Sequence, residues 1–293
     1  MLTRRAAVAT ALACATTPTV GAAQARTSPG TTMTERRGYA DCRFGQIHYR
    51  RLGAGRPLIL IHQTPWSSVQ FSRAAPQLAA SGIEAISIDT PGYGLSSTPP
   101  EPPSIEDYAD AVVEAIGAMG LTAPAVAGHH TGALIAGAMA SRHPASVSRL
   151  VLHGAPAYDA AERQQRLLRK HGDHSLKPDG SHLTDRWAYL KTLPGEQMSD
   201  EARQMAVLTY YLNGDLEWYG HTAAYRYDFG AAVPAIRCPT LVLTSRDDPI
   251  FSHGRRLTQM RPQWSYVELD GSTEVIFDRP AAWAGPVAAF VTA

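Results

Sequence analysis

The chain has 293 residues, of which 44% are hydrophobic, and its 27 basic and 26 acidic residues give a formal net charge of +1. This length can bury one large core and an insertion, and the balanced charge gives no polybasic surface of the kind that nucleic acids bind. No run approaches the ~18 apolar residues of a membrane-spanning helix. Composition therefore favours a single domain with a small-molecule partner, without nucleic acid or a membrane span, and leaves the oligomeric state open.

The N-terminus resembles a secretory signal peptide, with an arginine pair, an Ala-rich apolar stretch and an A-x-A-like cleavage site. Adjacent arginines are typical of twin-arginine export. We therefore expect residues 1–25 to be removed, residues 26–38 to form a linker, and the protein to be periplasmic or extracellular. The alternative is that translation starts at Met33, which would leave the protein in the cytoplasm.

The first predicted elements form one edge of a sheet. Residues 39–44 and 46–51 alternate about a glycine, as an antiparallel hairpin does. The apolar run 57–61 has the composition of a strand covered on both faces, and another strand, 83–88, follows a helix predicted over 69–80. Strands that alternate with helices after a hairpin favour a mostly parallel sheet with right-handed crossovers.

A helix with a capping box comes next, beginning at Ser104 and Asp107. The stretch 124–137 then predicts a buried strand, a very tight turn and a helix, with G-H-H-T-G at its centre. Gly128 and Gly132 flank the central histidine with the spacing of the nucleophile elbow, G-x-S-x-G. Small residues there let a strand reverse into a helix and place one side chain above the sheet. Here that side chain is a histidine.

The pattern changes after a strand predicted at 148–152. Residues 156–235 carry amphipathic helices at 160–171 and 200–212 and no parallel-strand signal. They are predicted to form a helical cap inserted into an α/β core. The core consists of two segments, 39–155 and 236–293. It closes with two more strands, a helix between them and a C-terminal helix.

With these motifs in order, the chain resembles the α/β-hydrolase fold superfamily from Tyr39 to its end. The resemblance implies a mostly parallel eight-stranded sheet with helices on both faces and an inserted helical cap. It also implies a nucleophile at the elbow, an acid after the strand near Thr244, and a histidine after the last strand. The matching stretches are Leu60-Ile61-His62 with Pro65, D-T-P-G-Y-G-L-S at 89–96, G-H-H-T-G at 128–132, and T-S-R-D-D-P at 244–249.

The resemblance places the acid at Asp248, with Asp247 as the near rival. Counted back from the proline that opens the C-terminal helix, the histidine position falls on Thr273, with Glu274 adjacent, and this loop contains no imidazole. The imidazole is thus missing from the far end of the site and present at His130. An ordinary Ser-His-Asp mechanism is excluded on this alignment.

The remaining groups predict a different centre. The backbone amides of Gln63 and Thr131 are expected to form an oxyanion hole. His130 can serve as a base or nucleophile near neutral pH, with Asp248 or Glu274 holding one ring nitrogen. It would deprotonate water, abstract a proton next to a carbonyl, or form an acyl-imidazole. The alternative is a degenerate site in which the histidine only fills the turn.

The predicted cap is rich in aromatic residues, which favours an apolar substrate cavity with hydroxyl groups, suited to a ring-bearing or otherwise apolar carbonyl compound. Substrate contacts are expected from His182, Trp187 and, at the end of a core strand, Trp66. The cap aromatics are Trp187, Tyr189, Tyr210, Tyr211, Trp218, Tyr219, Tyr225, Tyr227 and Phe229.

The histidines at strand ends, His62, His129 and His153, are predicted to be structural. No cofactor and no metal are expected, and the three cysteines show no C-x-x-C spacing. The alternative is a zinc site built by long-range convergence of His130, His182, Asp248 and Glu274.

These features predict a cofactor-independent enzyme of α/β-hydrolase fold that acts on an apolar, carbonyl-containing small molecule through His130. Hydrolysis of an ester, lactone or C–C bond is the first class of reaction. The alternatives are a lyase or isomerase that uses His130 as general base, and a catalytically inactive ligand-binding protein.

Overall fold

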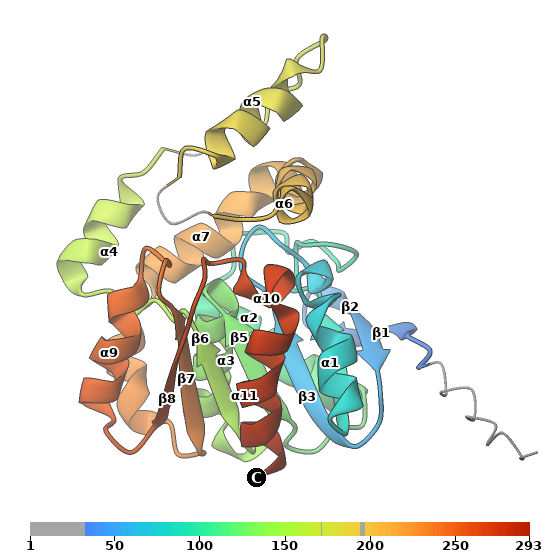
Figure 1. Ribbon diagram of the computed structural model, residues 1–293, viewed down its shortest axis with the longest axis vertical. Coiled ribbons are helices and arrows are strands. Elements are labelled where there is room, and N and C mark those ends of the chain that lie inside the picture. Colours follow the sequence, from blue (N-terminus) through green and yellow to red (C-terminus); the bar gives the residue numbers. More distant parts are fainter. Residues whose placement is uncertain (1–32, 171, 194–196) are drawn as a thin grey trace, which may run out of the picture. The chain divides into compact units, whose positions relative to one another are not determined.

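The computed structural model describes residues 33–170, 172–193 and 197–293. The predicted signal peptide, 1–25, and most of the predicted linker lie outside these residues. The strands are β1 (Arg36–Cys42), β2 (Gly45–Leu52), β3 (Arg56–Ile61), β4 (Ile83–Ile88), β5 (Ala125–His129), β6 (Leu150–His153), β7 (Thr240–Ser245) and β8 (Ser265–Leu269). They form one sheet in the order β1-β2-β4-β3-β5-β6-β7-β8 (Figure 1). β2 pairs antiparallel with β1 and β4, and the other neighbours are parallel, which confirms the predicted hairpin-led, mostly parallel sheet.

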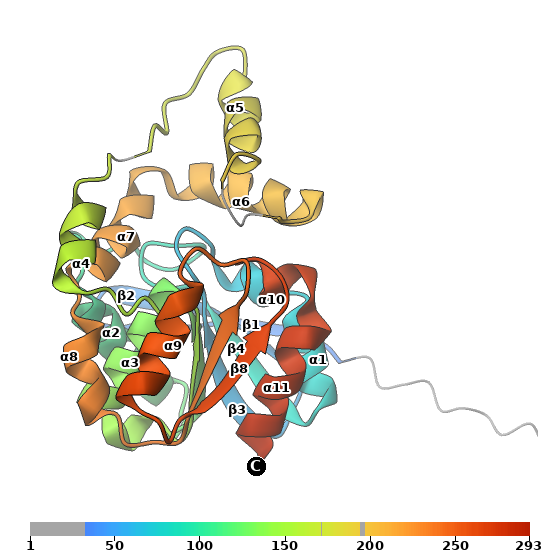
Figure 2. The same cartoon turned by 60° about the vertical axis from the view of Figure 1, so that its left-hand side comes forward.

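Helices cover both faces of this sheet. α1 (Ala74–Ala80) and α11 (Pro280–Thr292) pack on one face, and α2 (Ile105–Ala118) and α3 (Thr131–Arg142) pack on the other (Figure 2). The apolar run of β3 serves both cores, because alternate side chains of a strand point to opposite faces. Leu58 and Leu60 join the α1–α11 side, whereas the isoleucines between and after them join the α2–α3 side.

The tight turn between β5 and α3 depends on close backbone contacts. A Cβ atom on Gly128 would lie 2.1 Å from the carbonyl oxygen of Gly132, and one on Gly132 would lie 2.2 Å from that of Ile61. Between the glycines, His130 has φ +48° and ψ −112°, a left-handed conformation that L residues seldom adopt. The spacing of G-H-H-T-G is therefore dictated by the packing of three backbone segments.

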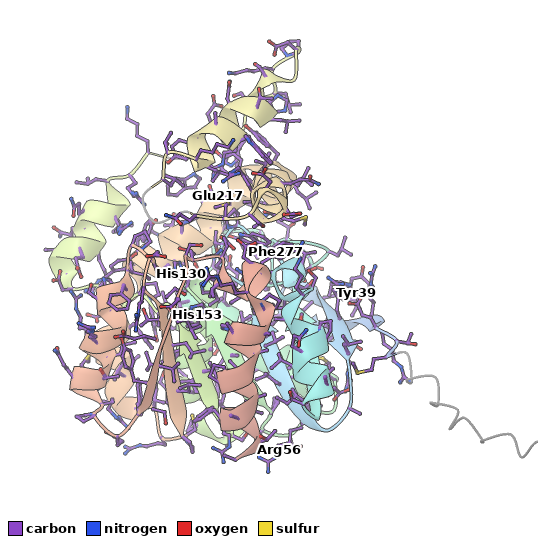
Figure 3. The ribbon with its side chains drawn as sticks, viewed as in Figure 1. Tyr39, Arg56, His130, His153, Glu217 and Phe277 are labelled. Atoms are coloured by element: carbon purple, nitrogen blue, oxygen red, sulfur yellow. The ribbon has the colours of Figure 1, made fainter. Side chains whose placement is uncertain are left out.

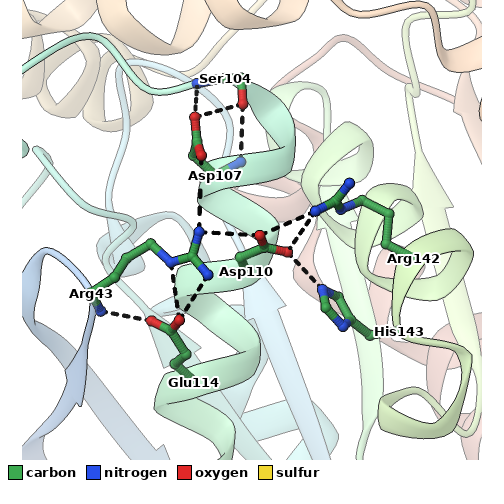
Figure 4. Close-up of polar contacts among 7 residues, drawn as sticks. All are labelled: Arg43, Ser104, Asp107, Asp110, Glu114, Arg142 and His143. Carbon is green, nitrogen blue, oxygen red and sulfur yellow. Dashed lines mark hydrogen bonds and ion pairs between the residues drawn. The ribbon is translucent and has the colours of Figure 1, made fainter.

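Ion pairs join the first hairpin to the helices beneath it (Figure 4). Arg43, in the β1–β2 turn, contacts Asp110 at 3.1 Å and Glu114 at 2.8 Å, both on α2. Asp110 also accepts from Arg142 and contacts His143 at the end of α3. α2 itself begins at the predicted capping box of Ser104 and Asp107. The network explains how an edge hairpin is held against a helix pair.

Helices occupy the described residues between β6 and β7, including most of the predicted cap, 156–235. They are α4 (Ala160–Leu167), α5 (Ser181–Leu190), α6 (Asp200–Asn213), α7 (Glu217–Arg226) and the short α8 (Phe229–Ala232), and no strand is assigned in this part of the described chain. α4 to α7 lie over the carboxyl ends of the parallel strands (Figures 1 and 2). α8 packs instead on α3, where the Phe229 ring fills the space left by Gly137.

Two further helices complete the described chain. α9 (Phe251–Met260) follows β7, and α10 (Val275–Asp278) follows the loop after β8. The helix predicted over 69–80 is divided in two, because the Ser67 side chain caps a separate turn, η1 (Ser68–Phe71), before α1. Among the residues that the structure describes, no helix is both long and apolar enough to cross a membrane.

Candidate active site

A cavity of about 660 Å³ lies between the His130 turn and the helices over it. Core residues on its wall include His130, Thr131, Thr64 and Asp248, and residues from α4 to α7 complete the lining. Figure 3 shows His130 at the upper end of the sheet and Glu217 above it, on α7. The cavity is therefore formed at the carboxyl ends of the strands, where the sequence motifs predict the site.

His130 and Asp248 form a direct pair. Nε2 of His130 lies 2.7 Å from Oδ2 of Asp248, whose side chain is 1% exposed, and the His130 side chain is 23% exposed. The backbone N–H of Ile250 donates to Oδ1 of Asp248 at 2.9 Å. Asp247, the rival candidate, is exposed. Of the two partners predicted for the histidine, the structure brings Asp248 to it.

The environment of Asp248 keeps this carboxylate ionised. Burial by itself raises the pKa of Asp248, but attraction to His130 and the hydrogen bonds from His130 and from the Ile250 amide outweigh burial and lower the pKa below its usual range. A buried carboxylate at this distance holds the imidazole in one orientation and stabilises its protonated form.

Gly154 leaves space for the pair. It follows β6, the strand that lies between β5 and β7, and has φ +54°. A Cβ atom there would lie 2.6 Å from Cδ2 of His130 and 3.0 Å from Oδ2 of Asp248. Sequence reasoning did not single out this glycine, although its place directly after a strand of the parallel sheet was a usable signal.

Glu274, the other carboxylate predicted to hold His130, is hydrogen-bonded to the Gln63 side chain. Its Oε1 accepts a hydrogen bond from Nε2 of Gln63 at 2.7 Å, and both side chains are buried. Thr273, at the position where the resemblance expects a histidine, is also buried, and its hydroxyl has no hydrogen-bond partner in the described chain. The loop after β8 thus supplies a carboxylate to the Gln63 side chain.

The predicted role of the Gln63 backbone amide is wrong. Its N–H donates to Oε1 of Gln70 at 3.1 Å inside the core, so it is not available to a substrate oxygen. The next residue, Thr64, lines the cavity together with Thr131, and neither backbone N–H has an acceptor among the described residues. A local motif cannot show this one-residue difference, because it depends on where the Gln70 side chain points.

Three expected substrate contacts lie away from the cavity wall. Trp66 is 1% exposed and packs against Phe277 at 5.6 Å between ring centroids. Trp187 packs on the apolar cluster that Trp66 and Phe277 form with residues of α5 and α6. The ring of His182 lies edge-on to that of Tyr211, at 5.0 Å between centroids. None of the three is among the described residues that line the cavity. They stabilise the packing of α5 and α6 instead.

Cationic side chains are the main feature of the cavity that sequence reasoning missed. The Arg186 guanidinium lies 3.8 Å from the ring centroid of Tyr210 and 5.1 Å from that of Tyr189, and its Nε is buried without a hydrogen-bond partner in the described chain. No ion pair to these cations occurs within the described ranges. The basic cluster R-L-L-R-K at 166–170, which begins in the last turn of α4, was an available signal. The cations on the wall are Arg166, Arg169, Lys170 and Arg186.

A second pair of an imidazole and a carboxylate faces the cavity from α7. Oε1 of Glu217 lies 3.1 Å from Nδ1 of His221, one helical turn later, and both residues line the cavity. Nε2 of His174 lies 3.8 Å from Oε2 of Glu217. The E-x-x-x-H spacing in the predicted cap was the sequence signal for this pair.

His129 and His153 are packed core histidines, as predicted. Their rings stack at 4.5 Å between centroids, and they bond to Gln70 and Ser245 respectively. Burial lowers the pKa of His153 to about 3 and that of His129 well below its ordinary value. Of the four alternative zinc ligands, the structure brings together His130 and Asp248: with His129 their ligand atoms lie within 4.8 Å of one another, and this group contains neither His182 nor Glu274.

Comparisons with known proteins agree with the fold. A family model described as the alpha/beta hydrolase fold matches residues 56–175. The chain is 30% identical over 211 residues to (E)-2-((N-methylformamido)methylene)succinate hydrolase of Acinetobacter baylyi, covering 69% of this chain and 76% of that protein. It is 30% identical over 208 residues to the AB hydrolase superfamily protein YisY of Bacillus subtilis, covering 68% of this chain and 76% of that protein.

Solved structures share the fold. The enol-lactonase from Burkholderia xenovorans LB400 superposes with a TM-score of 0.70 at 22% identity, covering 87% of this chain and 100% of that one. The E-2-(acetamidomethylene)succinate hydrolase superposes with a TM-score of 0.72 at 19% identity, covering 89% and 100%. At these identities the similarity concerns the fold alone.

Proposed function

This chain belongs to the α/β-hydrolase fold family and is a hydrolase-like enzyme, and from this premise we propose that it hydrolyses a carbonyl compound bearing a carboxylate, with His130 in place of the serine nucleophile. The observation that carries the proposal is that one cavity holds both the His130–Asp248 pair and Arg186, a cation without an acidic partner in the described chain. The His130–Asp248 pair can act as nucleophile or base in acyl transfer, and Arg186 can bind an anionic group of the substrate.

In this proposal G-H-H-T-G is the nucleophile elbow, with His130 as its central residue. Asp248 holds Nε2, so Nδ1 is the nitrogen through which the ring acts on the substrate. Nδ1 attacks the acyl carbon to form an acyl-imidazole, or it removes a proton from the water that attacks. In the first route the bond from the acyl carbon to the leaving atom breaks as the acyl-imidazole forms, and water then displaces the imidazole to give the carboxylic acid. In the second route water adds to the acyl carbon directly, and the bond to the leaving atom then breaks.

The negative charge that forms on the carbonyl oxygen needs donors. We assign this role to the backbone amides of Thr131 and Thr64, which line the cavity beside His130. Removing one oxyanion-hole donor in known enzymes raises the barrier by about 3 kcal/mol. The second donor is thus one residue further along the chain than the sequence predicts.

The substrate class follows from the cations. A guanidinium held between two aromatic rings is oriented before a ligand arrives, and it presents paired donors to a carboxylate. The aromatic wall of Tyr158, Tyr189, Tyr210 and Tyr225 retains the expected apolar character of the cavity. Support also comes from the name of one similar protein, a hydrolase of a substituted succinate.

We further propose that residues 1–25 direct twin-arginine export to the periplasm or the medium, and that 156–235 act as a cap over the core. The first proposal rests on the sequence alone. N-terminal sequencing of the mature protein tests it, and a chain that retains Met1 would contradict it.

The experiment is a substrate panel assayed with wild type and His130→Ala. It includes esters, lactones, N-acyl enamines and 1,3-diketones, each as a carboxylate and as its methyl ester. We expect the wild type to hydrolyse carboxylate-bearing members and His130→Ala to be inactive on them. Exchange of a carbon-bound proton without hydrolysis would favour the lyase or isomerase, and tight binding without turnover would favour the ligand-binding protein.

A further inference from the structure

The leaving group in an acyl transfer needs a proton, and His130 cannot supply one when it acts as the nucleophile. In a Ser-His-Asp centre the histidine gives this proton. Here the loop after β8 carries Thr273 and Glu274 at the corresponding positions. A basic leaving group therefore needs another proton donor on the cavity wall.

His221 has the geometry for this task. Its Nδ1 lies 3.1 Å from Oε1 of Glu217 and 3.2 Å from the Glu217 carbonyl oxygen, which makes Nδ1 a donor to Glu217. The ring stands between Trp218 and Tyr225, at 5.5 and 5.9 Å between centroids, and lines the cavity. With Nδ1 held in this way, Nε2 is the nitrogen left to act on a ligand.

The pair on α7 repeats the arrangement of the pair in the core. The His221 side chain is 26% exposed and Glu217 is 7% exposed, against 23% for His130 and 1% for Asp248. A salt bridge with this i, i+4 spacing on a helix surface is usually solvated on both sides and stabilises little. This one has a buried carboxylate and an imidazole on the wall of a cavity, which is the arrangement that acid–base catalysis uses.

A further imidazole, that of His174, lies between Glu217 and an exposed carboxylate. His174, whose side chain is 7% exposed, lies 3.8 Å from Oε2 of Glu217 and 3.4 Å from Oδ1 of Asp215, a fully exposed carboxylate. The His174 ring stacks on Tyr210 at 4.2 Å, which holds it in this position. The carboxylate that orients His221 is therefore itself in contact with a titratable group.

We infer that His221, oriented by Glu217, is the general acid that protonates the leaving atom, an inference that rests on the proposed function. As Nδ1 of His130 forms its bond to the acyl carbon, the bond from that carbon to the leaving oxygen or nitrogen breaks. His221 enters the step with a proton on each ring nitrogen; the leaving atom keeps the electron pair and takes the proton from Nε2 of His221, which leaves the ring neutral with its proton on Nδ1. Neutral His221 then accepts a proton from the water that hydrolyses the acyl-imidazole, so that both imidazoles return to their starting states.

The test compares His221→Gln with wild type on esters that share one carboxylate-bearing acyl group and differ in the leaving alcohol. An alkyl alcohol needs protonation as it leaves, whereas p-nitrophenol does not. We expect kcat to fall by about 10²- to 10⁴-fold for the alkyl ester and to change little for the p-nitrophenyl ester. Glu217→Gln should show the same dependence on the leaving group with a smaller loss.

His182→Gln is the matched control, since it removes a histidine of α5 that lies off the cavity wall, and it should leave both rates unchanged. An equal loss on both esters in His221→Gln would show a merely structural role and overturn the inference while the proposed function stands. Wild type without hydrolysis of either ester, as of the whole panel, would overturn the proposed function and the inference with it.

A second measurement does not need turnover. In nitrogen-15 histidine spectra of the whole protein, assigned with His221→Gln, we expect Nδ1 of His221 to be protonated in both the neutral and the charged ring, so that Nε2 is the nitrogen that gains and loses the proton, and we expect Glu217→Gln to change these signals more than His182→Gln does. A neutral His221 with its proton on Nε2 alone would overturn the inference.

Discussion

Nε2 of His130 lies 2.7 Å from Oδ2 of Asp248, although 118 positions separate the two residues in the chain. His130 follows β5, Asp248 follows β7, and Gly154 follows β6, the strand between them. Three adjacent parallel strands are thus followed by an imidazole, a glycine and a carboxylate. The glycine lets the other two side chains meet across it.

The first prediction concerns this pair. Asp248→Asn should reduce kcat by about 10²- to 10⁴-fold, because the amide neither stabilises an imidazolium nor holds the ring in one tautomer. His130→Ser should not produce an efficient esterase, since the loop after β8 offers Thr273 and Glu274 in place of a histidine. Steady-state kinetics on the best panel substrate measures both. Strong esterase activity of the serine variant would contradict the assignment of the site.

Gly154→Ala should abolish activity while the protein still folds. The new Cβ would lie 2.6 Å from Cδ2 and 2.8 Å from Nε2 of His130, so the ring has to move away from Asp248. A residue with a side chain at φ +54° also costs about 1–2 kcal/mol of stability.

Gly180→Ala is the control for the glycine substitution. Its φ of +75° imposes a similar backbone strain, but nothing lies within 4 Å of the added carbon. Both variants should lower the unfolding midpoint by similar amounts, and only Gly154→Ala should lose kcat. Full activity of Gly154→Ala would mean that the contact between His130 and Asp248 is not needed.

Arg186→Met should raise KM for carboxylate substrates by about 10-fold or more, because a hydrogen-bonded charge pair of this kind contributes about 1.5–3 kcal/mol. KM for the corresponding methyl esters should change little. Arg186→Lys should restore binding only in part, since an ammonium neither stacks on Tyr210 nor forms paired hydrogen bonds. Arg149→Met, which removes a cation over Phe290 on the other side of the fold, serves as control.

An unchanged ratio of kcat/KM between the carboxylate and its methyl ester in Arg186→Met would contradict the anion site. The same ratio measured in Arg149→Met sets the reference for the loss of one positive charge.

Stability should fall as the pH is lowered from 6.5 to 4, partly because of His253. Burial is the main reason why the pKa of His253 falls to about 4, and its Nδ1 accepts a hydrogen bond from the Ala157 amide, which requires the neutral ring. Below the unfolded pKa of about 6.5 the unfolded chain binds the proton and the folded chain does not, so the folded state loses about 1.4 kcal/mol per pH unit. Above pH 6.5 this dependence disappears.

Urea unfolding of wild type and His253→Gln at pH 7.5, 6.5, 5.5 and 4.5 tests this. The glutamine can still accept from Ala157 but does not titrate, so its stability should depend less steeply on pH below 6.5. The lowered pKa of Asp248 acts in a separate range, since its contribution is complete above about pH 3.8 and is lost only as the pH falls further. Parallel curves for the two proteins would contradict the role of His253.

Local sequence patterns predicted most strands, the start of one helix and the tight turn at His130. Apolar runs and alternation located the strands, the capping box located the start of α2, and G-H-H-T-G located a turn whose two glycines meet other backbone segments. The resemblance implied a mostly parallel eight-stranded sheet and an acid at Asp248, and it left open whether Asp248 or Glu274 holds His130. These features are predictable because each depends on neighbours in the chain or on the regular geometry of a parallel sheet.

Only the tertiary structure decided the rest. The Gln63 amide is occupied because Gln70 reaches it. Trp187 and His182 lie in the packing of α5 on α6, and Trp66 packs on Phe277 of α10. The cations around Arg186 and the pair of Glu217 and His221 come from separate helices that meet over one cavity. Side-chain direction and long-range contact fix these roles: the E-x-x-x-H spacing marks the pair on α7, but it does not show that the pair faces the cavity. The motif identified His130, and the fold brought Asp248 to its ring, placed Gly154 beside the pair and put cations on the same cavity wall.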